Sequence, residues 1–326
     1  MKKGIQKIET VSILGLGTMG HGIAQVFAAG GYRVRAFDEV PAARESLHAR
    51  CQENLNTMVS ARMLKRSSVA ATLSRMEVFD SIEEAVDGSD FVLEVVREDL
   101  AIKKKLFSFL EKCVSPSAIL ASNTSTFPMT KIAARLAHPQ RCVNMHWFNP
   151  SHIVPVVEII PGEKTSPETL AATIDLARQI GKTPVHVQQE VPGFIVNRVQ
   201  AAMIREVWDL WQSGVASAED IDLAVSGTMG FRLSAIGPLQ VCDFGGLDVW
   251  SKLFKELTPR MTSGVRVPSK IQSLVDNGHF GTKTQKGIFD YTQESLEQKR
   301  NERDRHFLEL AKLKQNSKSP AMGGLV

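Results

Sequence analysis

Two side chains that could exchange a proton, His146 and Glu158, lie close together in this chain. His146 ends a strand-like run that begins at Arg141, and Glu158 interrupts the apolar run 156–160. Taken alone, a histidine is more often a satisfied core or surface residue, and an acid inside an apolar strand either points to solvent or has a buried partner. If the chain folds back between the two runs, the carboxylate meets the imidazole and fixes its tautomer. The other ring nitrogen could then take a proton from a substrate hydroxyl, as oxidation of an alcohol by NAD requires.

Two further polar side chains could hold the oxygen from which that proton leaves. The cluster 122–126 follows the apolar run 118–121. Taken alone, such a cluster is more typical of a turn that satisfies its own backbone. At the end of a strand, however, the hydroxyl of Ser125 becomes a candidate to bind the substrate oxygen, together with the amide of Asn197.

A glycine-rich segment offers a site for a nucleotide. The pattern G-x-G-x-x-G occupies residues 15–20, which are Gly15, Leu16, Gly17, Thr18, Met19 and Gly20. The pattern is weak by itself, but here it follows the strand-like run 11–14 and opens the helical period of residues 19–29. The first glycine allows a tight turn, the second lets a pyrophosphate approach the backbone, and the third permits close packing. The phosphates are then expected at the positive end of the helix dipole.

An acid stands where a dinucleotide site needs one. Asp38 closes the next strand-like run, 32–37, at the distance from Gly15 that is typical of a group binding the adenosine ribose hydroxyls. Glu39 adds a second negative charge where NADP would bring a phosphate, so NAD is favoured. Three arginines nearby in sequence keep NADP open: Arg33, Arg35 and Arg44.

Strands that alternate with helices must position these residues. Further strand candidates are 91–95, 118–122, 141–146 and 156–160, with helical segments between most of them. This alternation predicts an α/β fold with a parallel, doubly wound sheet, whose ligand lies at the carboxyl ends of the strands.

The hydrophobic pattern of the sequence changes near Val191-Pro192-Gly193. Residues 194–211 are apolar on more than one side at helical spacing, and no convincing strand follows them. We therefore expect domains at 1–190 and 191–326, the second all-helical. A helix of this kind is usually buried in its own bundle or at a subunit interface. The charged stretch after Gln293 is expected to be a surface helix anchored by apolar residues of 307–313, with a frayed end at 318–326.

Composition excludes several other classes of protein. The chain has 326 residues and a net charge of only +4 that is spread along it, so nucleic acid is not an expected partner. No apolar run is long enough to span a membrane and residues 1–7 lack the apolar part of a signal peptide, which predicts a cytoplasmic protein. The four cysteines form no C-x-x-C pattern and the histidines show no metal-ligand spacing, so no metal site is expected.

Seven ordered motifs together resemble the L-3-hydroxyacyl-CoA dehydrogenase family. They are the glycine loop, Ser122-Asn123-Thr124-Ser125, His146-Trp147-Phe148-Asn149-Pro150, Val157-Glu158, the Pro192-Gly193-Phe194 motif with Asn197-Arg198, the 237–248 segment and the Gly281-x-Lys283-Thr284 segment. The resemblance covers residues 8 to 292. It implies an NAD-dependent oxidoreductase with a Rossmann domain and a helical domain that forms a homodimer, acting in fatty acid metabolism.

The same resemblance implies roles for individual residues. His146 is the implied general base, Glu158 its partner, and Ser125 and Asn197 are substrate contacts. The implied NAD contacts beyond the glycine loop are Asp38, Glu98, Lys103, Ser125, Asn149 and Lys283. Glu98, Lys103 and Lys283 rest on the resemblance alone, and otherwise read as ordinary surface charge.

The first hypothesis for the substrate is a short-chain L-3-hydroxyacyl-CoA, such as 3-hydroxybutyryl-CoA. Two departures from the family pattern favour an alternative, a small free hydroxy or aldehyde acid. Asn54 and Ala61 stand where CoA-active members carry Ser and Lys, and the 146–155 segment is similar to dehydrogenases of gulonate, carnitine and pyridine carboxylates. Arg62, Lys65 and Arg66 could replace the missing cation. A serine hydrolase built on Ser125 lacks the G-x-S-x-G elbow. An idle NAD-binding protein like lens crystallin would not need His146 and Glu158.

Overall fold

The computed structural model describes residues 7–264 and 266–316. Its contacts divide the chain into two compact units, each described here by itself. The first runs to Ile195 and resumes at Asp304, and the second is Val196–Arg303. The end of the last helix is thus grouped with the first unit, whereas the sequence analysis assigned it to the helical domain. The domain limits 1–190 and 191–326 stay predictions.

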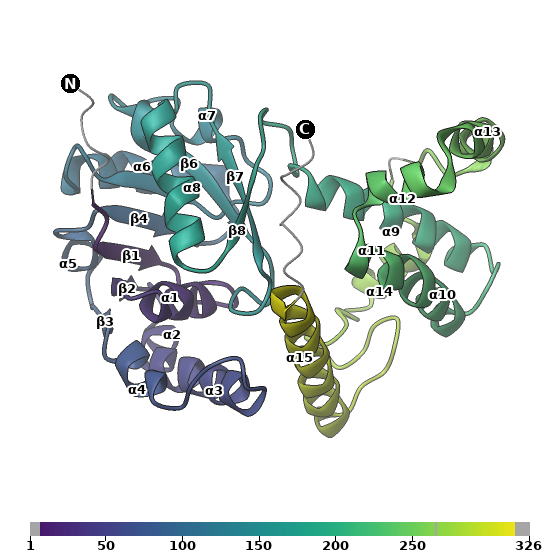
Figure 1. Ribbon diagram of the computed structural model, residues 1–326, viewed down its shortest axis with the longest axis horizontal. Helices are drawn as coiled ribbons and strands as arrows, with labels where there is room; N and C mark the ends of the chain where they lie inside the picture. The colour runs from purple at the N-terminus through teal and green to yellow at the C-terminus, as the bar shows by residue number, and fades with distance from the viewer. Residues whose placement is uncertain (1–6, 265, 317–326) are drawn as a thin grey trace. The chain divides into compact units, whose positions relative to one another are not determined.

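A single eight-stranded sheet forms the centre of the first unit, with strand order β3-β2-β1-β4-β5-β6-β7-β8 (Figure 1). The strands are β1 (Thr10–Leu14), β2 (Arg33–Phe37), β3 (Met76–Val78), β4 (Phe91–Glu94), β5 (Ile119–Ser122), β6 (Cys142–Trp147), β7 (Val156–Pro161) and β8 (Thr183–His186). Strands β1 to β6 are mutually parallel, in the order of a Rossmann sheet. The predicted α/β class is confirmed.

The sheet departs from the predicted all-parallel arrangement at β7. This strand runs antiparallel to β6, and β8 is parallel to β7. The reason lies in the connection, because residues 148–155 are too few for the crossover of about a dozen residues or more that parallel neighbours need. Strands β3 and β8 were not predicted. The first is very short, the second contains Pro184, and both lie at the edges of the sheet, where such sequences are tolerated.

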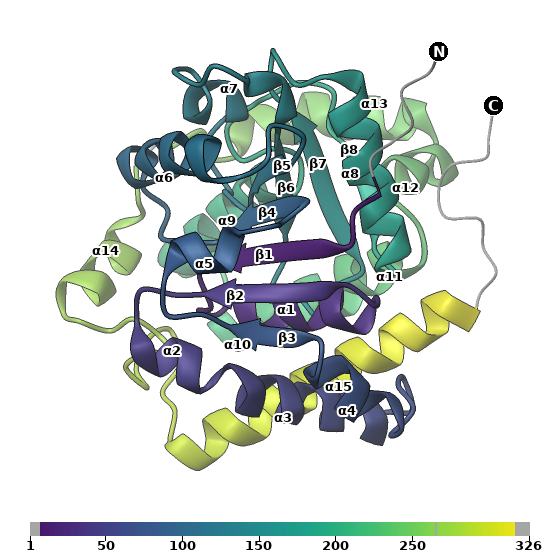
Figure 2. The same cartoon turned by 90° about the vertical axis from the view of Figure 1, so that its left-hand side faces the viewer.

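Helices cover both faces of the sheet (Figure 2). They are α1 (Gly20–Ala29), α2 (Pro41–Glu45), α3 (Leu47–Ser60), α4 (Ser68–Leu73), α5 (Ile82–Val86), α6 (Leu100–Cys113), α7 (Met129–Ile132), the short 3-10 helix η1 (Pro139–Arg141) and α8 (Pro167–Gln179). Helices α1 and α8 pack on one face, with α3 against α1, while α5, α6 and α7 pack on the other. Asp99 and Ser166 begin α6 and α8 by accepting backbone N–H bonds as N-caps.

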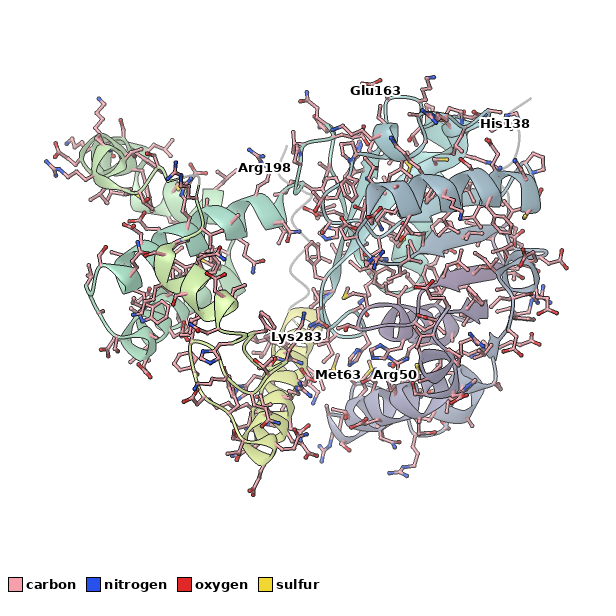
Figure 3. The ribbon with its side chains drawn as sticks, turned by 180° about the vertical axis from the view of Figure 1, so that it is seen from behind. Arg50, Met63, His138, Glu163, Arg198 and Lys283 are labelled. Carbon is pink, nitrogen blue, oxygen red and sulfur yellow. The ribbon has the colours of Figure 1, made fainter. Side chains whose placement is uncertain are left out.

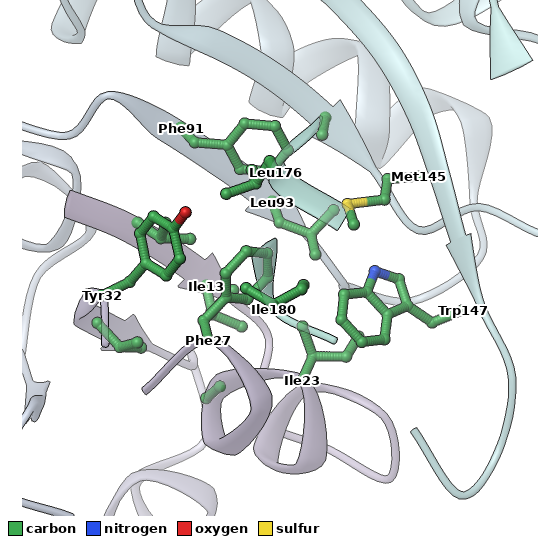
Figure 4. Packing of buried hydrophobic residues seen from close by; sticks show 14 of the residues in the cluster. Ile13, Ile23, Phe27, Tyr32, Phe91, Leu93, Met145, Trp147, Leu176 and Ile180 are labelled. Carbon is green, nitrogen blue, oxygen red and sulfur yellow. The ribbon is translucent and has the colours of Figure 1, made fainter. Parts of the chain in front are cut away.

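The alternation of side chains along the strands builds two separate cores. In β4, Phe91 and Leu93 face the α1 and α8 side, and Val92 faces the α6 side. Figure 4 shows the first core, in which the ring of Phe27 on α1 lies 5.8 Å from that of Trp147 on β6. These apolar layers hold the carboxyl ends of the parallel strands at one edge.

The second unit is helical, as predicted. Its elements are α9 (Val196–Gln212), α10 (Ala218–Val225), the π-helical turn η2 (Ser226–Gly230), α11 (Phe231–Ala235), α12 (Pro238–Gly245), α13 (Leu247–Leu257), the 3-10 helix η3 (Thr258–Arg260), α14 (Ser269–Asp276) and the start of α15 (Gln293–Asn316). Its described residues form no β-strand, and the only β structure among them is a pair of isolated β-bridges.

The predicted surface helix exists as α15, but its anchors differ from those expected. Leu308 is buried, whereas Phe307, Leu310 and Leu313 are exposed, and the second buried position is Leu296. Successive residues of a helix point about 100° apart, so the neighbours of Leu308 cannot share its contact. The predicted frayed end at 318–326 lies outside the described residues.

Candidate active site

Antiparallel pairing of β6 with β7 places His146 directly opposite Glu158. Nδ1 of the imidazole lies 2.7 Å from Oε2 of the carboxylate, and both side chains are buried. The second carboxylate oxygen, Oε1, accepts the backbone N–H of Ile195 at 3.0 Å. The contact that the sequence suggested is therefore present. Because Nδ1 donates to the carboxylate, Nε2 is the nitrogen with a lone pair for a proton.

Two aromatic rings hold the imidazole of His146 in place. The ring centre of Phe148 lies 4.6 Å from it and that of Phe194 lies 5.6 Å away. Phe194 is fully buried and has a φ of 49°, a left-handed conformation that is strained for a residue with a side chain. Sequence reasoning assigned no role to either ring. Their positions inside the two motifs next to His146 and before Asn197 were the available signal.

The glycine loop between β1 and α1 has the form that a dinucleotide needs. A Cβ on Gly15, whose φ is 103°, would meet the carbonyl oxygen of Val95 at 2.5 Å, and one on Gly20 would meet the carbonyl of Gly15 at 1.7 Å. A Cβ on Gly17 would meet nothing within 4 Å, so open space lies where a pyrophosphate would approach. Helix α1 has no side-chain N-cap and no acid in its first turn. Its N-terminal amides are thus available to an anion, and the residues fit NAD.

Asp38 at the end of β2 is fixed against this loop. Its Oδ2 accepts the N–H of Leu16 at 2.6 Å and its Oδ1 accepts the N–H of Val40 at 2.8 Å. Arg44, one of the arginines that kept NADP open, donates to the backbone carbonyl of Asp38 and to Asp80. These partners draw Arg44 away from a role in binding a phosphate, whereas Glu39 is exposed.

Arg50 on α3 also holds the glycine loop, through the backbone carbonyl of Leu16. Arg50 was not predicted from the sequence, and it is labelled in Figure 3. Its Nη2 donates to the carbonyls of Leu16 at 2.7 Å and Ala43 at 3.0 Å. Holding the loop carbonyls on one side leaves the loop amides directed to the other. Arg50 lies between Leu47 and Cys51 of the buried stripe of α3, and this helical phase was the sequence signal for it.

A buried polar network underlies the predicted Ser125 site. Lys103 on α6 is 1% exposed, so the interpretation of this residue as surface charge is wrong. Its Nζ lies 2.7 Å from Glu94 Oε1 and 3.2 Å from Glu98 Oε2. Ser122 Oγ donates to the other oxygen of Glu94 at 2.6 Å. The network thus joins the ends of β4 and β5 to α6.

Glu98 carries the network into the loop after β5. Its Oε1 accepts hydrogen bonds from the Thr124 hydroxyl, from the N–H of Ser125 at 3.1 Å and from the N–H of Thr126 at 3.0 Å. Burial raises the pKa of Glu94 despite Lys103. Burial also acts to raise the pKa of Glu98, but the bond from Thr124 and the charge of Lys103 lower it overall. Glu98 is therefore a charged acceptor that shapes the Ser125 loop.

The other predicted site residues are Asn149, Asn197 and Lys283. Among the described residues, no hydrogen bond or ion pair joins Asn149 to the His146, glycine-loop or Lys103 groups. Asn149 is exposed in the segment after β6. Asn197 lies in the first turn of α9, and Lys283 lies exposed between α14 and α15, both in the second unit.

The cations proposed to replace the missing CoA partner do not lie on α3. That helix ends at Ser60 in a Schellman motif, in which Met63 N–H bonds to the carbonyl of Met58 and Arg62 N–H to that of Val59. Arg62, with a φ of 57°, makes the left-handed turn. Arg62, Lys65 and Arg66 therefore lie in the exposed link to α4.

Within the described ranges, no group of three His, Cys, Asp or Glu side chains is arranged to hold a metal ion. No helix in the described part of the chain is both long and apolar enough to cross a membrane. All four cysteines are free, and burial raises the pKa of Cys51 and of Cys142 to about 12. The remaining two cysteines, Cys113 and Cys242, are not buried.

Comparison with known proteins decides the family. Residues 10–191 match the domain described as "3-hydroxyacyl-CoA dehydrogenase, NAD binding domain", and residues 193–291 match "3-hydroxyacyl-CoA dehydrogenase, C-terminal domain". The chain belongs to the 3-hydroxyacyl-CoA dehydrogenase family. It is accordingly an NAD-binding oxidoreductase.

Relatives within this family differ in the substrates that their names state. The 5-formyl-3-hydroxy-2-methylpyridine 4-carboxylate 5-dehydrogenase of Mesorhizobium japonicum is 37% identical over 94% of this chain and 98% of its own. A crystal structure of a dehydrogenase of this kind, described as an NAD+-dependent dismutase, has a TM-score of 0.88, 36% identity and the same coverage. The (S)-3-hydroxybutyryl-CoA dehydrogenase of Ralstonia eutropha has a TM-score of 0.72 and 34% identity, over 88% of this chain and all of its own.

Proposed function

We propose that His146 is the general base of an NAD-dependent dehydrogenation and that Glu158 is its partner. The observation that carries this proposal is the 2.7 Å contact between Nδ1 and Oε2 in a buried pair. The contact commits Nδ1 to donation, so Nε2 accepts the proton of a substrate hydroxyl. Buried Glu158 then stabilises the imidazolium that forms, and the rings of Phe148 and Phe194 keep its orientation.

When bound, NAD accepts the hydride that leaves the substrate carbon. Ser125 and Asn197 are proposed to donate hydrogen bonds to the oxygen as it becomes a carbonyl. The glycine loop residues 15–20 are proposed to bind the pyrophosphate and Asp38 the ribose. Glu98, Ser125, Asn149 and Lys283 are the further proposed cofactor contacts. Lys103, being buried, acts on the cofactor site through Glu98.

For the substrate, we propose first the small free hydroxy or aldehyde carboxylic acid. Helix α3 supports this class because its exposed surface after Arg50 presents Glu53 and no cation that could bind CoA phosphates. The likeness to the pyridine carboxylate dehydrogenase supports it as well. Its structure matches over 94% of this chain, compared with 88% for the 3-hydroxybutyryl-CoA dehydrogenase of Ralstonia eutropha. Arg198 and Arg232 are candidates to bind the substrate carboxylate.

A short-chain L-3-hydroxyacyl-CoA remains the second candidate, because Arg62, Lys65 and Arg66 form an exposed cationic link just beyond α3. The CoA-active relative from Ralstonia eutropha, with 34% identity over its full length, also supports this class. Phosphate contacts far from the reacting carbon are the same in ground and transition states, so they would lower KM without changing kcat.

The two substrate classes are separated by comparing acetoacetate and small hydroxy acids with acetoacetyl-CoA in an NAD(H)-linked assay. We expect turnover of a small acid, with KM unchanged by the triple substitution Arg62→Ala, Lys65→Ala, Arg66→Ala. Turnover of acetoacetyl-CoA whose KM rises several-fold in the triple variant, at constant kcat, would establish the CoA class instead. Added salt should raise that KM as well, because exposed charge pairs are screened over about 8 to 10 Å.

We also propose that the protein is a homodimer formed through its helical unit. Of the described side chains in Val196–Arg303, only Ile221 and Leu296 are buried. Large apolar side chains are instead exposed, among them Phe231 at 76%, Leu239 at 81% and Phe244 at 82%. A unit of this size normally buries a core, so these residues need a covering surface, and a second copy supplies one.

Sedimentation equilibrium checks the homodimer. We expect twice the mass of the chain, and a shift toward a single copy for Phe244→Asp or Leu239→Asp, because a charge in an apolar interface is costly. Leu313→Asp, at an exposed position on α15, is the matched control and should leave the mass unchanged. A single-copy mass for the unmodified protein would contradict the proposal.

A further inference from the structure

Lys182, between α8 and β8, is a buried cation that the proposed mechanism does not use. Its side chain reaches under the turn formed by residues 150–154, where Nζ donates to the carbonyls of Ser151 at 2.7 Å and Val154 at 2.6 Å. The ammonium also lies 5.3 Å from the ring centre of Trp147. No carboxylate lies within ion-pair distance of Nζ in the described part of the chain.

Burying the ammonium of Lys182 without a carboxylate costs free energy of folding. Lysine is rarely buried without an opposite charge, since the ammonium loses its hydration. Burial accordingly lowers the pKa of Lys182 to about 8. What the protein gains is a cross-link between the two ends of one turn, which makes only two backbone bonds of its own, from Ile153 and Val154 to the carbonyl of Pro150.

The turn held by Lys182 lies directly on the first turn of α1. Ser151 Oγ donates to the carbonyl of Met19 at 3.0 Å. A Cβ on Gly22 would lie 2.5 Å from that same Oγ and 3.3 Å from Nδ1 of His152, so only glycine allows this approach. Met19 is both the last variable residue of the glycine pattern and the N-cap of α1. The turn therefore supports the helix end at which the pyrophosphate is proposed to bind.

We propose that Lys182 is a positioning residue for NAD: it fixes the turn 150–154 against the first turn of α1 and thereby sets the shape of the cofactor site. This inference rests on the proposed binding of NAD at the glycine loop. The same turn would also position Asn149, a proposed cofactor contact that immediately precedes it. Lys182 itself touches neither cofactor nor substrate in this scheme.

The first test compares NADH binding by the unmodified protein with that of Lys182→Met and Lys182→Arg. Methionine keeps most of the side chain's length and has no donor, so we expect a Kd for NADH about tenfold higher, with kcat at saturating NAD changed less than twofold. Arginine donates to both carbonyls and should recover most of the affinity. Lys164→Met, on the exposed turn between β7 and α8, is the control and should bind normally.

The emission of Trp147 reports the charge of Lys182, because the ammonium lies 5.3 Å from the centre of its ring. Its emission should change as Lys182 loses its charge near pH 8, and the change should be absent in Lys182→Met and in Trp147→Phe. Titratable groups on the neighbouring elements include His152 in the turn, His21 on α1, and the Asp175–Arg178 pair on α8. Burial lowers the pKa of His21, so this imidazole titrates below the lysine.

Each outcome decides the inference. An NADH Kd for folded Lys182→Met within twofold of the unmodified protein overturns it. If Lys182→Met does not fold, Ser151→Ala takes its place, because it separates the turn from α1 and leaves Lys182 intact. An unchanged Kd in that variant overturns the inference, and a raised Kd supports it. Failure of the unmodified protein to bind NADH would instead contradict the proposed NAD site itself.

Discussion

Replacing His146 with glutamine is expected to lower kcat by about 10²- to 10⁴-fold while NADH still binds, because positioned general-base catalysis contributes a factor of that order. Glutamine fills similar space and cannot take the proton. The measurement is steady-state turnover of the accepted substrate, together with the Kd for NADH. Near-normal turnover in His146→Gln would remove His146 from the mechanism.

Glu158→Gln serves as the companion variant to His146→Gln. Its amide can still accept the hydrogen bond from Nδ1 but no longer carries the charge that stabilises the imidazolium. We therefore expect a loss of kcat that is smaller than that of His146→Gln. His138→Gln, an exposed histidine outside the site, is the control and should retain full turnover.

Replacing Lys103 with methionine is expected to have the largest effect on stability, a loss of about 3–5 kcal/mol in the free energy of unfolding. The substitution leaves the carboxylate of Glu94, which is fully buried, without its cation. Lys105→Met changes an exposed residue of the same helix and should stay within about 0.5 kcal/mol of the unmodified protein. Denaturant unfolding followed by circular dichroism measures both variants.

Two further measurements attribute that loss to the buried pair. Glu94→Gln combined with Lys103→Met should recover about 1–3 kcal/mol relative to the sum of the single losses. The deficit of Lys103→Met should also shrink at low pH. The pKa of Glu94 is raised in the folded protein, so the folded state keeps its proton more readily than the unfolded state, and the penalty appears only as pH rises through that raised pKa. A deficit that is independent of pH, with no coupling between the substitutions, would contradict this account.

The parts of the molecule that could be predicted from sequence are those determined by hydrophobic periodicity and turn residues within one short segment. The β1, glycine loop, α1 and β2 segment is one example, because strand, helix and glycines follow one another without a long-range step. The contact between His146 and Glu158 is another, since a short connection between two apolar runs allows few alternatives. In both cases the residues that meet lie close together along the chain.

The parts that could not be predicted depend on contacts between distant segments. Lys103, Lys104 and Lys105 are identical in type, and the first of them is set apart by its contact with Glu94 on β4. Helical phase offered a hint, because Lys103 shares its face with the buried Phe107 and Leu110. Lys182 gave no such sign, as its partners are backbone carbonyls, which no side-chain pattern records.

The antiparallel pairing of β6 with β7 makes the geometry of the proposed acid–base pair depend on the length of one connection. A slip of one residue would carry Glu158 to the opposite face of the sheet, away from the imidazole, while leaving an equally well bonded ladder. The number of residues between Trp147 and Val156 is thus constrained in addition to the contacts that Phe148 and Ser151 make. Insertion or deletion of a single residue there is therefore expected to separate the proposed acid–base pair even where the sheet itself stays intact.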